Sequence, residues 1–227
     1  MVTLITLHLL SSANYDQALG VLKKNTELAK KAKGFVSRKV AIDIKDRLRG
    51  YSITTFKSAS DLDAFRKNPE RPTLVFQGPQ MFEKTSAGNT LVFTKVDVDV
   101  FKVDNEASNS RANPKSWKNR FTQISLHMFH QKNYHQGLEV LRVNTPIASK
   151  QKGFVSRQVY VGIDKPLKGY SIATWETMKD LEGYRTAPGR PEIVHGDDGM
   201  SYEKTASGLV PVFPLVESGV FQIAFEA

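Results

Sequence analysis

Two histidines are the residues whose type and position best suit them to accept a proton. His8 and His127 stand at matching places in two halves of the chain, each after a leucine near the end of a predicted strand. An imidazole has an unperturbed pKa near neutrality and can act as a general base toward a phenolic proton. A purely structural histidine, hydrogen-bonded where a strand meets a helix, fits the same pattern. Because a duplication keeps either kind of residue, the repetition does not distinguish a catalytic histidine from a structural one.

The second half carries polar and aromatic residues that the first half lacks. Trp175 stands where the first half has Phe56, and His195 stands where it has Phe76. If only one half is active, these differences favour the second. The catalytic candidates are His8, His127, Tyr170 and Trp175.

Arginines open the second predicted strand of each half. Arg38 or Arg157 at a cavity mouth could hold an anionic substrate or a developing oxyanion, while a surface salt bridge is the plain alternative. Asn144, on the first helix of its half, is either a ligand contact or a local hydrogen-bonder. The substrate-binding candidates are Arg38, Tyr51, Phe56, Asn144, Arg157 and His195.

The elements that must position these residues occur twice. Lys33-Gly34-Phe35-Val36-Ser37-Arg38 returns as Lys152-Gly153-Phe154-Val155-Ser156-Arg157. Over the aligned halves roughly 45 per cent of paired positions are identical, which indicates a duplication. The sequence therefore predicts two domains, 1–103 and 119–227, joined by a polar linker over 104–118.

Each half follows the order βαββαβ. Hydrophobic periodicity in the first half predicts strands over 3–10, 35–44, 48–56 and 90–101, and helices over 15–33 and 61–67. A helix cap is expected within 11–14 and another at Ser58, and Gly34 is expected to stop the first helix. The stretch 68–88 is expected to be a functional loop or lid with a short strand at 81–85. Pro146 is expected to break the first helix of the second half.

This order predicts an α+β fold with two ferredoxin-like domains. Both helices would cover one face of each sheet and leave the other face bare. The two bare faces are expected to pack together, as an intrachain version of a symmetric dimer.

Composition narrows the classes of function. The chain has 227 residues, a net charge of +9, 40% hydrophobic residues and no cysteine. Thiolate chemistry and disulfides are thereby excluded, and a cytoplasmic location is expected. No apolar run is long enough to span a bilayer, and no basic leader opens the sequence. The scattered lysines favour solubility over nucleic-acid binding.

The motif Gly153-Phe154-Val155-Ser156-Arg157, followed by Tyr170-Ser171-Ile172-Ala173-Thr174-Trp175-Glu176, resembles the antibiotic biosynthesis monooxygenase family of the dimeric α+β barrel superfamily. The resemblance covers nearly the whole chain. It implies a cavity between the sheet and the helices of each domain. Members include cofactor-independent monooxygenases acting on polyphenolic substrates, and haem-degrading enzymes with an aromatic residue where Trp175 stands.

The resemblance favours a cofactor-independent monooxygenase that acts on a small aromatic or polyketide-like substrate. The alternatives are a haem-binding or haem-degrading protein, for which an expected asparagine on the first strand is replaced by His127, and a non-catalytic small-ligand-binding module. A duplicate with filled cavities is a further possibility. No cofactor is expected, and the partner is a small molecule, with further homo-oligomer formation left open.

Overall fold

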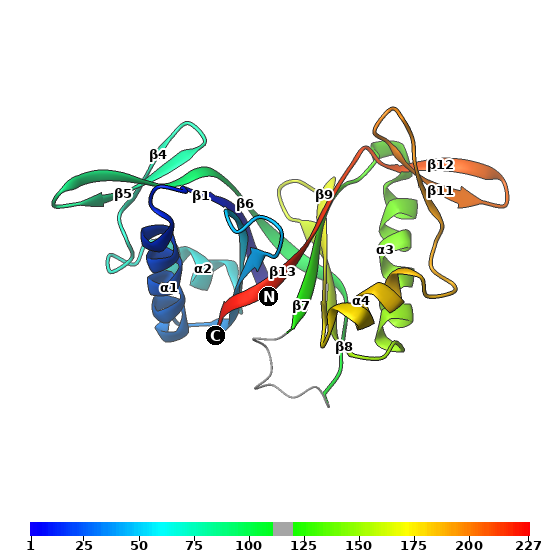
Figure 1. Cartoon of the computed structure of the whole chain (residues 1–227), viewed down its shortest axis with the longest axis horizontal. Helices are drawn as coiled ribbons and strands as arrows, with labels where there is room; N and C mark the ends of the chain where they lie inside the picture. Colours follow the sequence, from blue (N-terminus) through cyan, green and yellow to red (C-terminus); the bar gives the residue numbers. More distant parts are fainter. Residues whose placement is uncertain (111–119) are drawn as a thin grey trace. The chain divides into compact units, whose positions relative to one another are not determined.

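A computed structural model describes residues 1–110 and 120–227. These residues fall into two compact units, which are described separately (Figure 1). Unit 1 comprises Met1–Phe101 together with Phe221–Ala227, and unit 2 comprises Lys102–Val220.

Unit 1 has the expected element order. Its elements are β1 (Val2–Leu10), α1 (Tyr15–Lys31), β2 (Phe35–Asp43), β3 (Arg49–Phe56), α2 (Ala59–Arg66), β4 (Leu74–Gln77), β5 (Gln80–Thr85) and the first part of β6 (Gly88–Ser108). The strands pair antiparallel in the order β6-β1-β3-β2, which is the order of a ferredoxin-like sheet. The predicted short strand at 81–85 is confirmed as part of β5, which forms a hairpin with β4.

Unit 2 repeats this order. Its elements are β7 (Phe121–Met128), the 3-10 turn η2 (Gln131–Asn133), α3 (Tyr134–Ser149), β8 (Phe154–Gly162), β9 (Lys168–Trp175), α4 (Met178–Arg185), β10 (Ile193–His195), β11 (Ser201–Thr205), β12 (Gly208–Phe213) and the first part of β13 (Leu215–Glu226). Its sheet runs β13-β7-β9-β8. Pro214, which has no N–H to donate, separates β12 from β13, and β10, β11 and β12 form a sheet of their own.

The repeated hexapeptide turns the chain from the first helix into the second strand. Gly34 and Gly153 have φ of 71° and 68°, a region that L side chains rarely adopt. A Cβ at Gly34 would lie 2.2 Å from Asp61 Oδ2, and one at Gly153 would lie 2.2 Å from Asp180 Oδ2. Glycine is therefore required at both positions. The turn fixes where Arg38 and Arg157 enter the sheet.

Each core lies between the helices and one face of the sheet. In unit 1, Leu22 of α1 packs with Val40 of β2 and Phe93 of β6. Leu62 and Phe65 of α2 pack with Phe56 of β3. In unit 2 the residues at the matching places do the same. Burial of these side chains, each worth roughly 1.5–3 kcal/mol, holds the helices on the sheet.

Two local expectations were wrong, and a third was confirmed. Asn14 makes no side-chain cap bond, because its amide donates to the Leu91 carbonyl at 3.0 Å and ties the start of α1 to β6. Pro146 does not break α3, which runs through it to Ser149. A proline this near the helix end removes one hydrogen bond, and the buried Leu141 and Ala148 on either side hold the helix on the sheet. The predicted cap at Ser58 is confirmed, since its hydroxyl accepts from Asp61 N at 3.1 Å.

The strand after the first repeat is longer than expected. β6 continues to Ser108, so residues 104–108 of the predicted linker are strand, and most of the remaining linker lies outside the described residues. β13 likewise extends beyond unit 2, and its end pairs with β2 of unit 1 from Phe221↔Asp43 to Glu226↔Lys39. The domain limits drawn from the sequence stay a prediction, as does the packing of the two bare sheet faces against each other.

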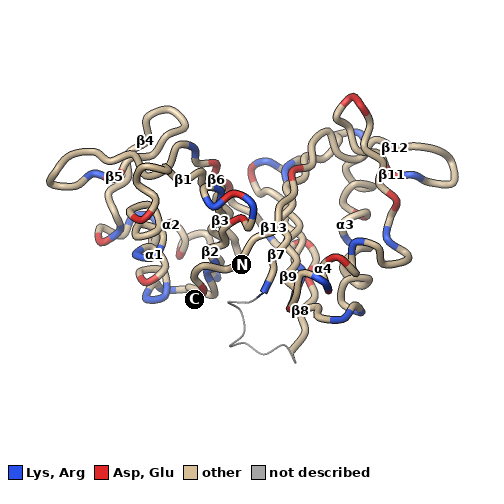
Figure 2. Tube along the Cα trace, viewed as in Figure 1, with Lys and Arg blue, Asp and Glu red and all other residues tan. Residues whose placement is uncertain are grey.

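Charged residues of both signs are spread along the chain of each unit (Figure 2). In the described part of the chain, no helix is both long enough and apolar enough to cross a membrane.

Candidate functional site

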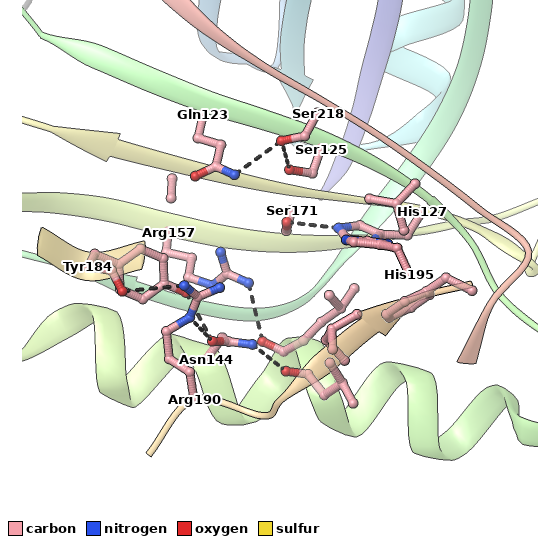
Figure 3. Close-up of a pocket in the computed structure, with 16 residues that line it drawn as sticks. Gln123, Ser125, His127, Asn144, Arg157, Ser171, Tyr184, Arg190, His195 and Ser218 are labelled. Atoms are coloured by element: carbon pink, nitrogen blue, oxygen red, sulfur yellow. Dashed lines mark hydrogen bonds between the residues drawn. The ribbon is translucent and has the colours of Figure 1, made fainter. Parts of the chain in front are cut away.

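Each unit contains a cavity between its sheet and its helices. The cavity of unit 1, about 310 Å³, is bounded by β1, α1, β2, β3, α2, the β4–β5 hairpin and β6. The cavity of unit 2, about 240 Å³, is bounded by β7, α3, β8, β9, α4, β10, β12 and β13 (Figure 3). Both volumes lie near the lower end of the range for small-molecule sites.

The histidine expected to accept a proton lines each cavity. His8 Nε2 lies 3.0 Å from Ser52 Oγ, and His127 Nε2 lies 3.0 Å from Ser171 Oγ. Both side chains are more than nine-tenths buried, and neither Nδ1 has a hydrogen-bond partner within the described residues. A buried polar atom without a protein partner is available for a hydrogen bond to a ligand in the cavity.

Burial keeps both histidines neutral. Loss of solvation, together with the charge of Arg38, lowers the pKa of His8 to about 3. Loss of solvation, together with Arg157, lowers the pKa of His127 to about 3. Each imidazole therefore meets a ligand in its neutral form, with one nitrogen on a serine and the other unpaired.

A buried arginine lines each cavity on the second strand. Arg38 Nε donates to Thr26 Oγ1 at 3.0 Å, and its Nη1 donates to Thr54 Oγ1. Arg157 donates to Thr145 Oγ1 at 3.3 Å and to the Leu141 carbonyl at 3.4 Å. The hydrogen-bond acceptors of both guanidiniums among the described residues are neutral, so neither arginine forms the surface salt bridge that was the alternative interpretation.

A second arginine reaches each cavity from the loop after the second helix. Arg190 Nε donates to Asn144 Oδ1 at 3.0 Å, and its guanidinium lies over the Tyr184 ring at 4.5 Å. Tyr184 Oη donates to the same Asn144 oxygen at 3.1 Å, so these three side chains form one cluster with Arg157 nearby (Figure 3). In unit 1, Arg71 Nε donates to Asn25 Oδ1 at 3.0 Å.

Neither cavity contains a carboxylate to balance these cations. Among the described residues that line them, none is Asp or Glu. Loss of solvation, together with the charge of Arg71, lowers the pKa of Arg38 to about 10. Loss of solvation also lowers the pKa of Arg157; Tyr184 opposes this shift, and Arg190 adds to it. Buried cations without an opposite charge favour an anionic ligand.

The structure thus brings together part of the predicted set. His127, Asn144, Arg157 and His195 line the cavity of unit 2, and His8 and Arg38 line that of unit 1. His195 lies at the mouth, where its Nδ1 is 2.9 Å from Ser201 Oγ.

Four predicted site residues do not line either cavity. Tyr51 and Tyr170 alternate with the lining residues Ser52 and Ser171, so they point to the opposite face of the sheet. Phe56 is buried against Phe65 at 5.4 Å, and Trp175 is stacked on Tyr184 at 4.9 Å. Both aromatics therefore lie in the core beneath the second helix, and their proposed contact with substrate has no geometric support.

Sequence reasoning omitted several lining residues. Ser52 and Ser171 lie within the repeated Gly-Tyr-Ser-Ile motif, and Arg71 and Arg190 lie within a repeated Arg-Pro motif. Repetition could have marked them as candidates. It could not show which of them face a cavity.

The donor set does not fit haem or a metal well. In each buried histidine, Nε2 lies within hydrogen-bonding distance of a serine hydroxyl. The remaining nitrogen, Nδ1, is the one nearer the backbone, and the ring centroid lies 4.7–4.9 Å from that of a phenylalanine. A porphyrin is larger than the ligands that cavities of 240–310 Å³ usually hold. No cluster of His, Asp and Glu suited to a metal ion occurs in the part of the chain that the structure describes.

Known structures share this fold over nearly the full length. A provisionally named monooxygenase from Fusobacterium nucleatum matches with a TM-score of 0.69, 8% identity and coverage of 99% of this chain and 93% of that one. A provisionally named monooxygenase from Lactobacillus acidophilus matches with a TM-score of 0.65, 9% identity and coverage of 100% and 95%. An anthrone oxidase-like protein matches with a TM-score of 0.62, 12% identity and coverage of 100% and 92%.

No family model and no curated protein sequence matches this chain. The structural likeness shows the fold: an α+β chain with two ferredoxin-like units. The fold class and the resemblance expected from the sequence are confirmed at this level.

Proposed function

We propose that this protein is a cofactor-independent oxygenase that acts on a small aromatic or polyketide-like substrate held as its anion. One observation carries the proposal: paired guanidiniums without a carboxylate share a small cavity with a neutral buried histidine. The fold shared with provisionally named monooxygenases and an anthrone oxidase-like protein supports the same reaction class.

The chemistry needs an electron-rich carbanion or phenolate and dioxygen. An activated CH₂ group loses a proton to give a delocalised anion, and dioxygen adds to the carbon to give a hydroperoxide. Loss of water then leaves a ketone, so that R₂CH₂ and O₂ give R₂C=O and H₂O. Dioxygen is the only oxidant, and the protein has to stabilise the anion and position it.

The arginines supply most of that stabilisation. A guanidinium in a site shielded from water stabilises a developing oxyanion far more than it would in bulk solvent. Arg157 is already oriented by Thr145 and Leu141, and Arg190 is oriented by Asn144. Little reorganisation is then needed when the anion forms.

The histidine accepts the proton at its unpaired Nδ1. With a pKa of about 3, His127 is a weak base toward a phenol when the cavity is empty. A bound anion beside Arg157 would lower the cost of deprotonation and favour the protonated imidazole. Ser171 holds the other ring nitrogen and so fixes the ring orientation.

The low basicity of these histidines favours a second candidate, a module that binds a small anion without catalysis. The same cavity, arginines and hydrogen bonds would serve it. The two candidates differ only in whether dioxygen is consumed.

Dioxygen uptake with anthrone and with 1-naphthol, measured at an oxygen electrode in the presence of a chelator, tests the reaction. We expect uptake with stoichiometric formation of the ketone or quinone. Replacing the arginine on the second strand of each unit, Arg38→Gln with Arg157→Gln, should lower the rate by about 10²-fold. Arg185→Gln, which changes the same charge at an exposed position on α4, is the control and should leave the rate unchanged.

The histidine variants then separate the roles. If His8→Gln with His127→Gln abolishes uptake but retains binding of the substrate, the histidines are the proton acceptors. If uptake survives this double substitution, they are not. Binding without uptake in the unsubstituted protein would leave only the non-catalytic candidate.

A further inference from the structure

The two cavities share one polar frame. A histidine on the first strand, an asparagine on the first helix, an arginine on the second strand, a serine on the third strand and an arginine on the following loop occur at matching places in both units. In unit 1 they are His8, Asn25, Arg38, Ser52 and Arg71, and in unit 2 they are His127, Asn144, Arg157, Ser171 and Arg190. Whatever anionic group one cavity accepts, the other can accept as well.

The mouths of the two cavities differ by a coordinated replacement. In unit 1, Phe76 and Met81 face each other across the β4–β5 hairpin, and Phe76 is 54% exposed. In unit 2, the matching pair across β10 and β11 is His195 and Ser201, which are hydrogen-bonded at 2.9 Å. An apolar pair in unit 1 thus corresponds to a pair in unit 2 whose side chains form a hydrogen bond with each other.

The sheet sides of the cavities differ in the same direction. Unit 1 presents Leu4 and Val98, whereas unit 2 presents Gln123 and Ser218 at the matching places. Gln123 Nε2 donates to Ser218 Oγ at 3.1 Å, and Ser125 Oγ lies 2.7 Å from that same hydroxyl (Figure 3). Tyr184 adds a hydroxyl where unit 1 has Phe65.

From these differences we infer that the two cavities are specialised: unit 1 binds an anion with an apolar body, and unit 2 binds an anion whose body carries several hydroxyl or carbonyl groups. An apolar ring would bury the exposed Phe76 and meet Leu4, Met81 and Val98 in unit 1. The same ring in unit 2 would displace water from Gln123 and Ser218 without replacing its hydrogen bonds, which is unfavourable. The inference rests on the proposed function only for the anionic character of the ligand.

Two probes with the same carboxylate and different bodies test the inference. They are 2-naphthoate, which has an apolar body, and 3,4,5-trihydroxybenzoate, which has a hydroxylated body. Isothermal titration of the full chain should give one site for each. Arg71→Gln should weaken 2-naphthoate by about tenfold and leave trihydroxybenzoate unchanged, and the matched variant Arg190→Gln should do the reverse.

Exchanging the walls gives an independent measurement. Gln123→Leu with Ser218→Val gives unit 2 the wall of unit 1, so 2-naphthoate should then bind at two sites and trihydroxybenzoate should weaken by about tenfold. Leu4→Gln with Val98→Ser is the reciprocal exchange. These side chains are exposed or half-buried, but Leu4 also packs against the core around Phe56, so thermal unfolding checks that each variant keeps its fold. If an exchanged variant does not fold, the titrations of Arg71→Gln and Arg190→Gln test the inference by themselves.

The outcomes separate this inference from the proposed function. If each arginine variant weakens both probes equally, the cavities are not specialised, whatever reaction they perform. If neither probe binds, the anionic ligand class is wrong and the specialisation falls with it. If the probes discriminate as expected while no phenolic substrate consumes dioxygen, the oxygenase proposal fails and the specialisation stands.

Discussion

At the scale of single residues, the unusual feature is a pair of histidines that stay neutral at ordinary pH while the cavities hold no anion. His8 and His127 are buried, each beside an arginine, and the pKa of each is lowered to about 3. A histidine kept neutral in this way is a fixed hydrogen-bonding group at physiological pH. The charge of the neighbouring arginine, rather than a charge on the imidazole, then determines which ligand the cavity binds.

This burial predicts a loss of stability in mild acid. From pH 6.5 downward the unfolded chain takes up protons on these histidines, whereas the folded chain does not until about pH 3. The unfolded state therefore binds more protons in this window, and the free energy of unfolding falls as the pH falls. Between pH 6.5 and 5 the loss should be on the order of 2 kcal/mol for each histidine.

Urea unfolding at a series of pH values measures this loss. The double variant His8→Gln with His127→Gln should be less dependent on pH over the same window, since glutamine does not titrate. Carboxylates contribute equally to both proteins, so the difference between the two curves isolates the histidines. Parallel curves would contradict the assignment.

At the scale of elements, the repeated Lys-Gly-Phe-Val-Ser-Arg turn connects the fold to the site. In unit 2, Gly153 allows the chain to pass beside Asp180 in the first turn of α4, and Arg157 then enters the sheet pointing into the cavity. Asp180 and Thr177 form a cap, in which Thr177 Oγ1 accepts from Asp180 N at 3.1 Å. The turn, the cap and the arginine therefore depend on one another.

Gly153→Ala should destabilise unit 2. The backbone φ of 68° costs a residue with a Cβ about 1–2 kcal/mol, and moving Asp180 from the cap costs roughly a further 1 kcal/mol. Gly183→Ala is the control, because Gly183 lies within α4 with nothing within 4 Å of its Cβ position. That change should stabilise the protein by up to about 1 kcal/mol. Thermal unfolding measures the stability of both variants, and a Gly153→Ala variant as stable as the unsubstituted protein would refute the argument.

At the scale of the whole chain, the last residues complete the first unit. Phe221 is fully buried against Tyr51, with ring centroids 5.3 Å apart. The backbone of Ala227 exchanges two hydrogen bonds with Arg38, each 2.8 Å long. The strand that carries the arginine of the unit 1 cavity is therefore held by the C-terminal segment of the sequence.

Deleting residues 221–227 should open unit 1 before unit 2. Hydrogen exchange of the β2 amides that face β13 should accelerate, and 2-naphthoate binding should weaken, because Arg38 loses its backbone partners. The amides of β9 in unit 2 provide the internal comparison and should keep their protection. A deletion that removes Ala227 alone should give the same effect in weaker form. Equal loss of protection in both units would show that the units unfold together.

The sequence alone determined the duplication, the order of the elements and the ferredoxin-like class. Hydrophobic periodicity, and the glycine and serine residues at the ends of elements, are signals that can be recognised within a few residues. It also marked His8, His127, Arg38 and Arg157, which repeat within local motifs. It did not separate Tyr170 from Ser171, its neighbour in the strand, because both repeat equally well and only the sheet assigns them to opposite faces.

Only the tertiary structure determined the charge balance of the site. Arg190 and Asn144 lie far apart in the sequence, and the fold places them 3.0 Å apart with no carboxylate among the described residues lining the cavity. It likewise assigned Trp175 to the core and residues 221–227 to the first unit. Such long-range choices depend on which surfaces meet, and a pattern that repeats over a few residues contains no information about that.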